Sequence, residues 1–225
     1  MPPFEKTPRN KVRRVAERGK YDREAVYRIV DDALICHVGF VVNDQPFVIP
    51  TIHARDGDSI LLHGAKASRL LKHVKEGHPV CITCTHLDGL VLARSVFHHS
   101  MNYRSVVLFG SGRIVDDPDE KMTALEILTD HIMPGRWDDA RHPNAKEMNA
   151  TTMVRVEIES ASAKQRTGPV GDDEDDYALP IWAGVLPIER AFLDPESDSR
   201  LVDGVALPEY VRSYHRTGNN NNLAT

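Results

Sequence analysis

The residues with the clearest chemical potential lie at the start of a predicted helix, in the segment SILLHGAKASRLLKHVKEG over 59–77. Lys66 and Arg69 flank Ser68, a residue type that caps helices, so we expect the helix to begin at about Ser68. The first backbone N–H groups of a helix have no partner within it and attract an anion. Lys66 and Arg69 add full charges, and the Ser68 hydroxyl adds a donor. The pairing is typical of a phosphate site. The alternative, which the local sequence alone favours, is an ordinary capped helix with solvated Lys and Arg.

A second polar segment, FHHSMNYRS over 97–105, joins two predicted strands. It combines hydrogen-bonding and aromatic side chains, which can close over a planar heterocycle. These side chains are Ser100, Asn102, Tyr103 and Arg104. A contact between two subunits is the alternative, and a site shared between subunits would need both.

An apolar edge precedes the helix, and its residues are Phe47, Val48, Ile49, Pro50 and Thr51. Proline removes one backbone donor from a strand, so we expect the backbone after Ile49 to be released from the ladder at Pro50. Those free groups could face the ring of a planar ligand. The alternative is an edge strand that ends at the proline.

Neither a metal site nor a reactive dithiol is expected. Cys81 and Cys84 form a CxxC pattern, but they lie in a strand-like run, where residues three apart face opposite sides. Among eleven histidines only His98 and His99 are adjacent, and neighbours on an extended chain point apart. His63 and His99 remain candidates for proton transfer because imidazole titrates near neutral pH, with a structural role as the alternative.

Composition limits the class of protein. The chain has 225 residues, 41% of them apolar and 27% charged, as in an ordinary globular protein. The net charge of −5 gives no general attraction to nucleic acid or to an anionic membrane, so a phosphate site must be local. The apolar run over 34–42 contains His37 and is too short to span a bilayer, and prolines and charges fill the N-terminus. We therefore expect a cytoplasmic protein.

Short strands separated by turn residues dominate the pattern from Leu34 onward. The expected strands are 34–42, 46–54, 59–63, 80–87, 90–97, 105–115 and 151–158, with turns at 43–44, 56–58 and 88–89. Helices are expected over 22–33, 68–76 and 118–133. Because most strands follow one another without a crossover helix, the order predicts an antiparallel barrel with flanking helices.

Three long segments, QPFVIPTIHARDGDSILLHGAKASR, FHHSMNYRSVVLFGSGRIV and AKQRTGPVGDDEDDYALPIWAGVLP, resemble the pyridoxamine 5′-phosphate oxidase-related family of flavin-nucleotide-binding split barrels. Within it the chain most resembles the branch that includes the nitroimidazole-resistance proteins. The resemblance covers about residues 12–190. It implies a mainly β fold, a six-stranded antiparallel split β-barrel, and a homodimer with FMN between subunits.

The resemblance also implies site residues. Lys66, Ser68 and Arg69 would hold the FMN phosphate. The remaining cofactor contacts would be Val48, Ile49, Pro50, Thr51, His63, Gly64, Ser100, Asn102, Tyr103, Arg104 and Trp182. The expected organisation is an N-terminal extension over 1–20, the barrel domain over 21–190, and a C-terminal extension with a disordered tail over 191–225.

The C-terminal sequence departs from that of the pyridoxamine phosphate oxidases. Their closing segment grips the pyridoxal product and ends in RLxP, whereas this chain ends in PEYVRSYHRTGNNNNLAT. Oxidation of the vitamin is therefore not expected. An FMN-dependent oxidoreductase acting on a small planar molecule is the main hypothesis. The alternatives are a non-catalytic flavin-binding or storage protein, and a split barrel that binds deazaflavin or haem.

Overall fold

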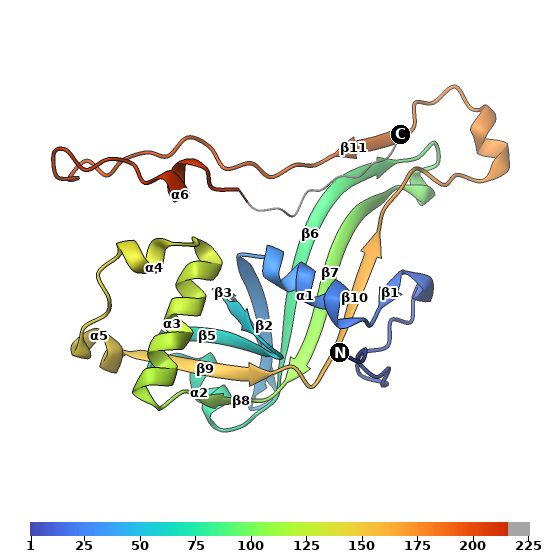
Figure 1. The fold of residues 1–225 in the computed structure, drawn as a ribbon. Helices are drawn as coiled ribbons and strands as arrows, with labels where there is room; N and C mark the ends of the chain where they lie inside the picture. Colours follow the sequence, from blue (N-terminus) through green and yellow to red (C-terminus); the bar gives the residue numbers. More distant parts are fainter. Residues whose placement is uncertain (216–225) are drawn as a thin grey trace.

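The computed structural model describes residues 1–215 and consists of two antiparallel sheets with helices on their flanks (Figure 1). The larger sheet has seven strands in the order β1-β10-β7-β6-β2-β3, with β11 paired to β6, and the smaller has the order β4-β5-β9-β8. The strands are β1 (Gly19–Lys20), β2 (Ile35–Val42), β3 (Gln45–Ile52), β4 (Ala54–Asp56), β5 (Ser59–Ala65), β6 (Val80–Leu92), β7 (Ser100–Gly110), β8 (Gly112–Ile114), β9 (Thr151–Glu157), β10 (Ser160–Arg166) and β11 (Gly184–Pro187). The predicted mainly β, antiparallel architecture is confirmed.

The chain passes between the two sheets at three short breaks, which give the barrel its split form. β3 leads to β4 at His53, β7 leads to β8 at Ser111, and β9 leads to β10 at residues 158–159. His53 is fully buried, and its Nε2 lies 3.1 Å from the Val30 carbonyl oxygen. At the second break a Cβ on Gly110 would overlap the Glu157 carbonyl oxygen, so only glycine allows these backbones to approach.

Six helices within residues 1–215 lie around the sheets. They are α1 (Arg23–Asp32), α2 (Arg69–Lys75), α3 (Pro118–Ile132), α4 (Arg136–Asp139), α5 (Ala145–Ala150) and α6 (Glu209–Arg212), and the 3-10 turns are η1 (Ala16–Arg18), η2 (Val96–His98) and η3 (Glu174–Ala178). The three predicted helices are confirmed, and their caps are Asp22, Ser68 and Asp117. The main core lies between the sheets under α1 and α2, and includes Ile29, Leu62 and Val74. A smaller core packs α3 against the other face of β5 and β9.

The predicted turn at 88–89 is wrong. β6 continues through this point to Leu92, and its register with β7 shifts between Leu87 and Gly89. The Asp88 carboxylate accepts from Arg104 Nε and Nη2, so the turn-like residue is a bulge whose side chain is bound. At Gly89 the backbone of β11 approaches closely, since a Cβ there would lie 3.1 Å from the Leu186 carbonyl oxygen. A pair of residues typical of turns therefore accommodates a bulge and an added strand.

Two further predictions are wrong, and one strand was missed. β3 is not interrupted at Pro50, which pairs with His37 and leaves the strand intact to Ile52, because β3 is an edge strand. The segment over 97–105 is not simply a loop, since β7 begins at Ser100. β10 was not predicted as a strand because its SASAKQR sequence lacks the bulky residues typical of strands.

The N-terminal segment packs along the larger sheet, and the described part of the C-terminal segment contacts α3 and α4. The N-terminal segment is held by Asn10, which is buried and donates to the Ala161 carbonyl oxygen. Beyond β11 the chain extends past the body and returns at α6, where Tyr210 hydrogen-bonds Asp139 and Phe192 contacts Tyr214 (Figure 1). The predicted disordered tail with its NNNN run lies outside the described residues. No helix within residues 1–215 has the length and apolar character needed to cross a membrane.

Candidate functional site

The predicted phosphate-binding segment lies at the edge of the smaller sheet, where β5 runs into α2. The Ser68 hydroxyl accepts a hydrogen bond from the Leu71 N–H at 3.4 Å, as an N-cap does. Gly64 lies so close to α2 that a Cβ there would be 3.2 Å from Leu71 Cδ1. Because α2 spans seven residues, attraction of an anion depends mainly on the side-chain charges around its start.

Arg69 and Lys66 lie exposed on different sides of that helix start. The Arg69 guanidinium lies over the Phe47 ring of β3, 4.1 Å from its centroid. The pKa of the Lys121 ammonium in α3 is lowered mainly by burial and, to a smaller extent, by the nearby charge of Lys66. Two cations that make no ion pair with any described residue therefore flank the Ser68 cap.

The apolar edge predicted to line a ring is an exposed strand surface next to this segment. Val48 is 66% exposed and Pro50 is exposed, whereas Ile49 and Thr51 are half-buried on the opposite face of β3. Of these four residues, Val48 and Pro50 therefore present their side chains to the outer face.

His63 of β5 is half-buried, and its Nδ1 is buried with no hydrogen-bond partner among residues 1–215. Burial lowers the pKa of the His63 imidazole, which favours the neutral form. A neutral imidazole with an unused nitrogen is suited to bind a metal or a donor group.

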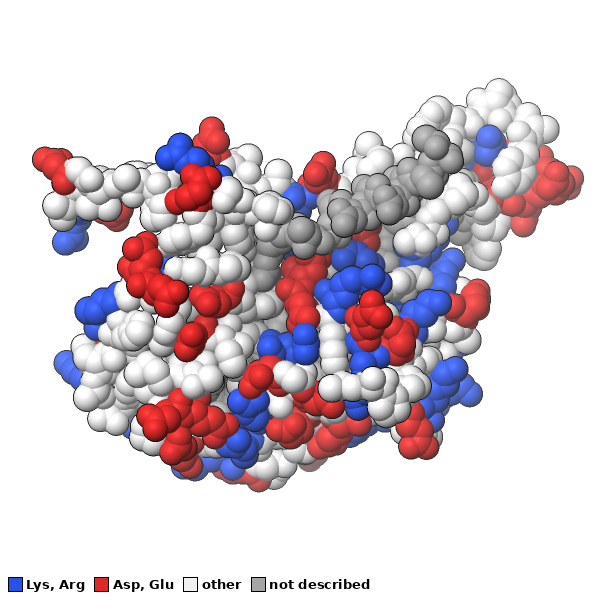
Figure 2. All heavy atoms as spheres, in the orientation of Figure 1, with Lys and Arg blue, Asp and Glu red and all other residues white. Residues whose placement is uncertain are grey.

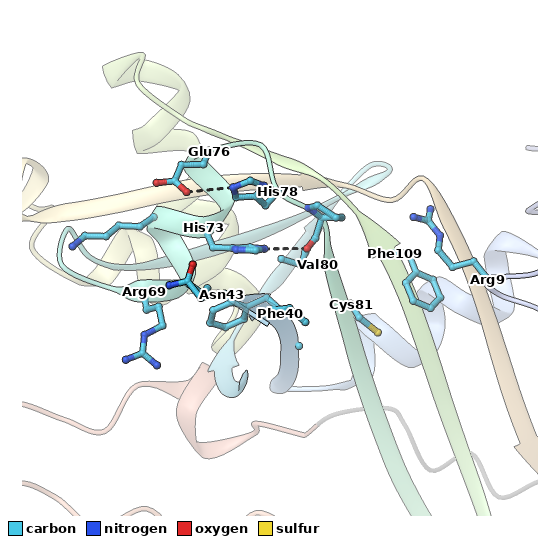
Figure 3. A pocket seen from close by; sticks show the side chains of 15 residues that line it. Arg9, Phe40, Asn43, Arg69, His73, Glu76, His78, Val80, Cys81 and Phe109 are labelled. Carbon is cyan, nitrogen blue, oxygen red and sulfur yellow. Dashed lines mark hydrogen bonds and ion pairs between the residues drawn. The ribbon is translucent and has the colours of Figure 1, made fainter. Parts of the chain in front are cut away.

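A groove of about 870 Å³ begins at Arg69 and continues beside α2 onto the outer face of the larger sheet (Figure 3). Its apolar lining includes Val41 and Phe109, which are accessible, and Phe40 and Val80, whose side chains are almost fully buried. The cations at its rim are Arg9, Arg69 and Lys72, and Glu76 is the one acidic residue among the described residues that line it. The sequence analysis did not find this groove, because Arg9 and Phe109 meet α2 only in the folded chain.

The second predicted cluster lies at the other end of the β6–β7 ladder, away from α2 (Figure 1). Asn102 donates to the Gly168 carbonyl oxygen and accepts from Arg166. Arg104 binds Asp88 through two nitrogens and Asp32 through Nη1 at 3.1 Å. These contacts occupy the polar groups of both residues. The two predicted clusters therefore do not meet within one chain.

The far end of this ladder exposes apolar residues around two histidines. Val96 is 86% exposed, Phe97 is 88% exposed, and Trp182 is 69% exposed. His99 Nδ1 lies 2.9 Å from the Ser95 carbonyl oxygen, which orients the ring and leaves Nε2 without a described partner. The aromatic side chain predicted to contact a cofactor, Trp182, lies at this end and not beside α2.

Three side chains with metal-ligand atoms also lie close together at this end of the ladder. They are His98, Asp172 and Asp176, and one ligand atom of each lies within 4.8 Å of the others. The Asp172 carboxylate already accepts from the Arg94 guanidinium and from two backbone N–H groups. These donors compete with a cation for the same oxygens, and Arg94 adds an opposing charge.

Acidic and basic side chains are interspersed over the visible face of the molecule (Figure 2). No extended surface of one sign is seen there, which agrees with the small net charge. Binding of an anion must therefore depend on a local arrangement such as the one around Arg69.

The fold and this arrangement define a split barrel with a cationic helix start at its edge. A family model described as pyridoxamine 5′-phosphate oxidase matches residues 22–165. The chain belongs to the pyridoxamine 5′-phosphate oxidase family. No curated protein matches it.

Among solved structures, the chain is 41% identical to the flavocytochrome Anf3 from Azotobacter vinelandii, with a TM-score of 0.88 and coverage of 93% of this chain and 97% of that chain. It is 33% identical to a FAD and haem binding protein from Mycobacterium smegmatis, with a TM-score of 0.83 and coverage of 87% and 96%. A candidate 5-nitroimidazole antibiotic resistance protein from Bacteroides thetaiotaomicron is 22% identical, with a TM-score of 0.56 and coverage of 65% and 85%. That last likeness shows the fold alone, so the expected nitroimidazole-resistance branch receives no further support.

Proposed function

We propose that this protein binds FAD and haem and acts in electron transfer as an oxidoreductase. The observation that carries the proposal is the 41% identity over nearly the whole chain to a flavocytochrome, together with the 33% identity to a FAD and haem binding protein. The sequence predicted FMN, and we propose FAD in its place. Haem binding, which the sequence analysis gave as an alternative, is part of the proposal.

The flavin phosphate is assigned to the start of α2, where Lys66 and Arg69 flank Ser68. Both cations are exposed and make no ion pair with a described residue, so an anion would not have to displace a partner. The outer faces of Val48 and Pro50 supply apolar contact for the ring. A bound flavin supplies hydride or electron transfer, and the protein fixes its orientation and local charge.

The remaining predicted contacts would reach the flavin from a second copy of the chain or would contact the second cofactor. These residues are Ser100, Asn102, Tyr103, Arg104 and Trp182. Their distance from α2 along the β6–β7 ladder supports this assignment. A flavin that contacts both sets requires two chains, so the homodimer remains part of the proposal.

Two histidines fit the requirements of a haem ligand. His99 has one ring nitrogen oriented by a backbone carbonyl, as metal-binding histidines do, and exposed apolar neighbours that a porphyrin could cover. His63 has a buried nitrogen without a partner among residues 1–215, and it lies near the end of β5, the strand that leads to the Ser68 cap. Haem bound at either would supply one-electron chemistry.

The absorption spectrum of the purified full chain tests the proposal. We expect both a flavin spectrum and a Soret band, and chromatography of the released flavin should identify FAD. Loss of the Soret band in either His63→Ala or His99→Ala, with the flavin retained, would identify the haem ligand. A protein that takes up neither added flavin nor added haem would refute the proposal. Bleaching of the flavin by NADH or NADPH without oxygen would separate an oxidoreductase from a storage protein.

A further inference from the structure

The groove beside α2 is continuous with the proposed flavin phosphate site through one residue. Arg69 flanks the Ser68 cap and also lines the groove, so an anion held at the helix start lies at the groove entrance. Beyond it, the groove passes Lys72 and His73 on the same helix and reaches Val41 and Phe109 on the sheet. Figure 3 shows Arg69 at one end and Arg9 with Phe109 at the other.

The groove combines an apolar floor with a cationic rim. The ring of Phe40, which is 5% exposed, lies 5.6 Å from the Phe47 ring and 5.1 Å from the His73 ring between centroids, and the Arg69 guanidinium lies over Phe47. The accessible part of the floor is formed by Val41 and Phe109. Glu76, the one carboxylate at the rim, lies 3.4 Å from His78 Nε2. Lys72 and Arg69 make no ion pair with a described residue. The rim therefore favours an anion, although the chain as a whole is acidic.

We propose that this groove holds the adenosine diphosphate half of FAD, with Arg69 and Lys72 at the diphosphate and the adenosine on the apolar floor; this rests on the proposed flavin function. FAD differs from FMN by an added adenosine monophosphate unit, which must leave the phosphate site in some direction. The groove begins at that site, and its volume of about 870 Å³ lies in the range of small-molecule sites. Aromatic rings and guanidinium planes are common stacking surfaces for purine bases.

Lys72→Glu is the test, because it reverses one rim charge at an exposed position of α2. Lys75→Glu is the matched control, since it makes the same change on the same helix outside the groove. Affinity for FAD and for FMN is measured separately on each flavin-free protein by titration of flavin fluorescence. We expect Lys72→Glu to weaken FAD binding about tenfold or more and to change FMN binding less than about twofold. Lys75→Glu should change neither.

A second variant tests the groove without altering charge. A Cβ on Gly39 would meet only ordinary contacts, with Cys81 carbonyl oxygen nearest at 3.6 Å, so Gly39→Val should fold while it narrows the floor. We expect it to weaken FAD binding and to leave FMN binding unchanged.

Three outcomes would overturn the proposal, and they are distinguishable. If Lys72→Glu loses FAD and FMN affinity equally, or loses neither, the adenosine does not bind in the groove, and the proposed flavin site is unaffected by that result. If light scattering shows a different molecular mass for Lys72→Glu than for the unaltered chain, and its FAD affinity is unchanged, the groove is an interface between copies of the chain. Failure of the unaltered chain to bind either flavin would refute the proposed function itself.

Discussion

Arg104 provides the most direct test of a buried ion-pair network in this fold. The sequence predicts it as a cofactor contact, and within one chain its guanidinium joins two carboxylates. Its Nε and Nη2 lie 3.0 and 2.9 Å from Asp88, and its Nη1 lies 3.1 Å from Asp32. The Arg104, Asp32 and Asp88 side chains are only 17%, 7% and 21% exposed. Burial opposes the charge of Arg104, but its bonds to Asp88 and Asp32 outweigh burial and raise the guanidinium pKa.

We expect Arg104→Met to lower the free energy of unfolding by about 3 kcal/mol. Removing one partner of a fully buried ion pair costs about 3–5 kcal/mol, because the remaining charge keeps its desolvation cost. The partial exposure of Arg104 and Asp88 places the expectation at the lower end of that range. Methionine retains most of the aliphatic stem, so the loss of charge and hydrogen bonds dominates.

Arg113→Met is the matched control. Arg113 also binds a carboxylate through two nitrogens, 2.6 and 3.2 Å from Glu120, but its side chain is 55% exposed. Exposed pairs contribute below about 1 kcal/mol. Urea unfolding of both variants, with cofactor content matched because ligands add to stability, gives the comparison. Equal losses below about 1 kcal/mol in both variants would show that burial of the Arg104 pair does not determine its contribution.

Two further predictions concern Gly110, where the chain crosses between sheets, and His63. Gly110→Ala should lower the free energy of unfolding by more than about 3 kcal/mol, since its Cβ would overlap a backbone oxygen of Glu157. Gly171→Ala should be nearly neutral because nothing lies within 4 Å of its Cβ, and equal thermal stability of the two variants would contradict this prediction. NMR titration should give His63 a pKa below its usual value of about 6.5, because burial disfavours the charged imidazole. Since the unfolded state then binds the proton more tightly, the contribution of His63 to stability should fall as the pH drops below about 6.5. A pKa of His63 at or above about 6.5 would contradict its burial.

Local chemistry made the helices and hairpin turns predictable. Asp22 and Ser68 cap their helices with the hydrogen bonds that their residue types predict. Asn43 and Asp44 both adopt positive φ in the turn between β2 and β3, as the Asn-Asp pair suggested. Such features depend on a few neighbouring residues, so the sequence contains the whole cause.

Long-range pairing was not predictable in the same way. Asp88 and Gly89 are typical of a turn, yet Arg104 and β11 make them a bulge within one long strand. The sequence predicts that residues 100–104 and 66–69 contact one cofactor shared between subunits. Within one chain these two segments lie at opposite ends of the β6–β7 ladder, which the sequence alone did not indicate.

The sequence by itself determined the cationic helix start, the antiparallel order of most strands and the family. Only the tertiary structure decided that Arg104 joins Asp32 to Asp88 and that Arg9, Phe109 and Lys72 line one groove with Arg69. The physical reason is range. A cap or a turn is stabilised by residues within one or two turns of the chain, whereas a buried ion pair or a groove requires surfaces that only the packing of distant strands brings together.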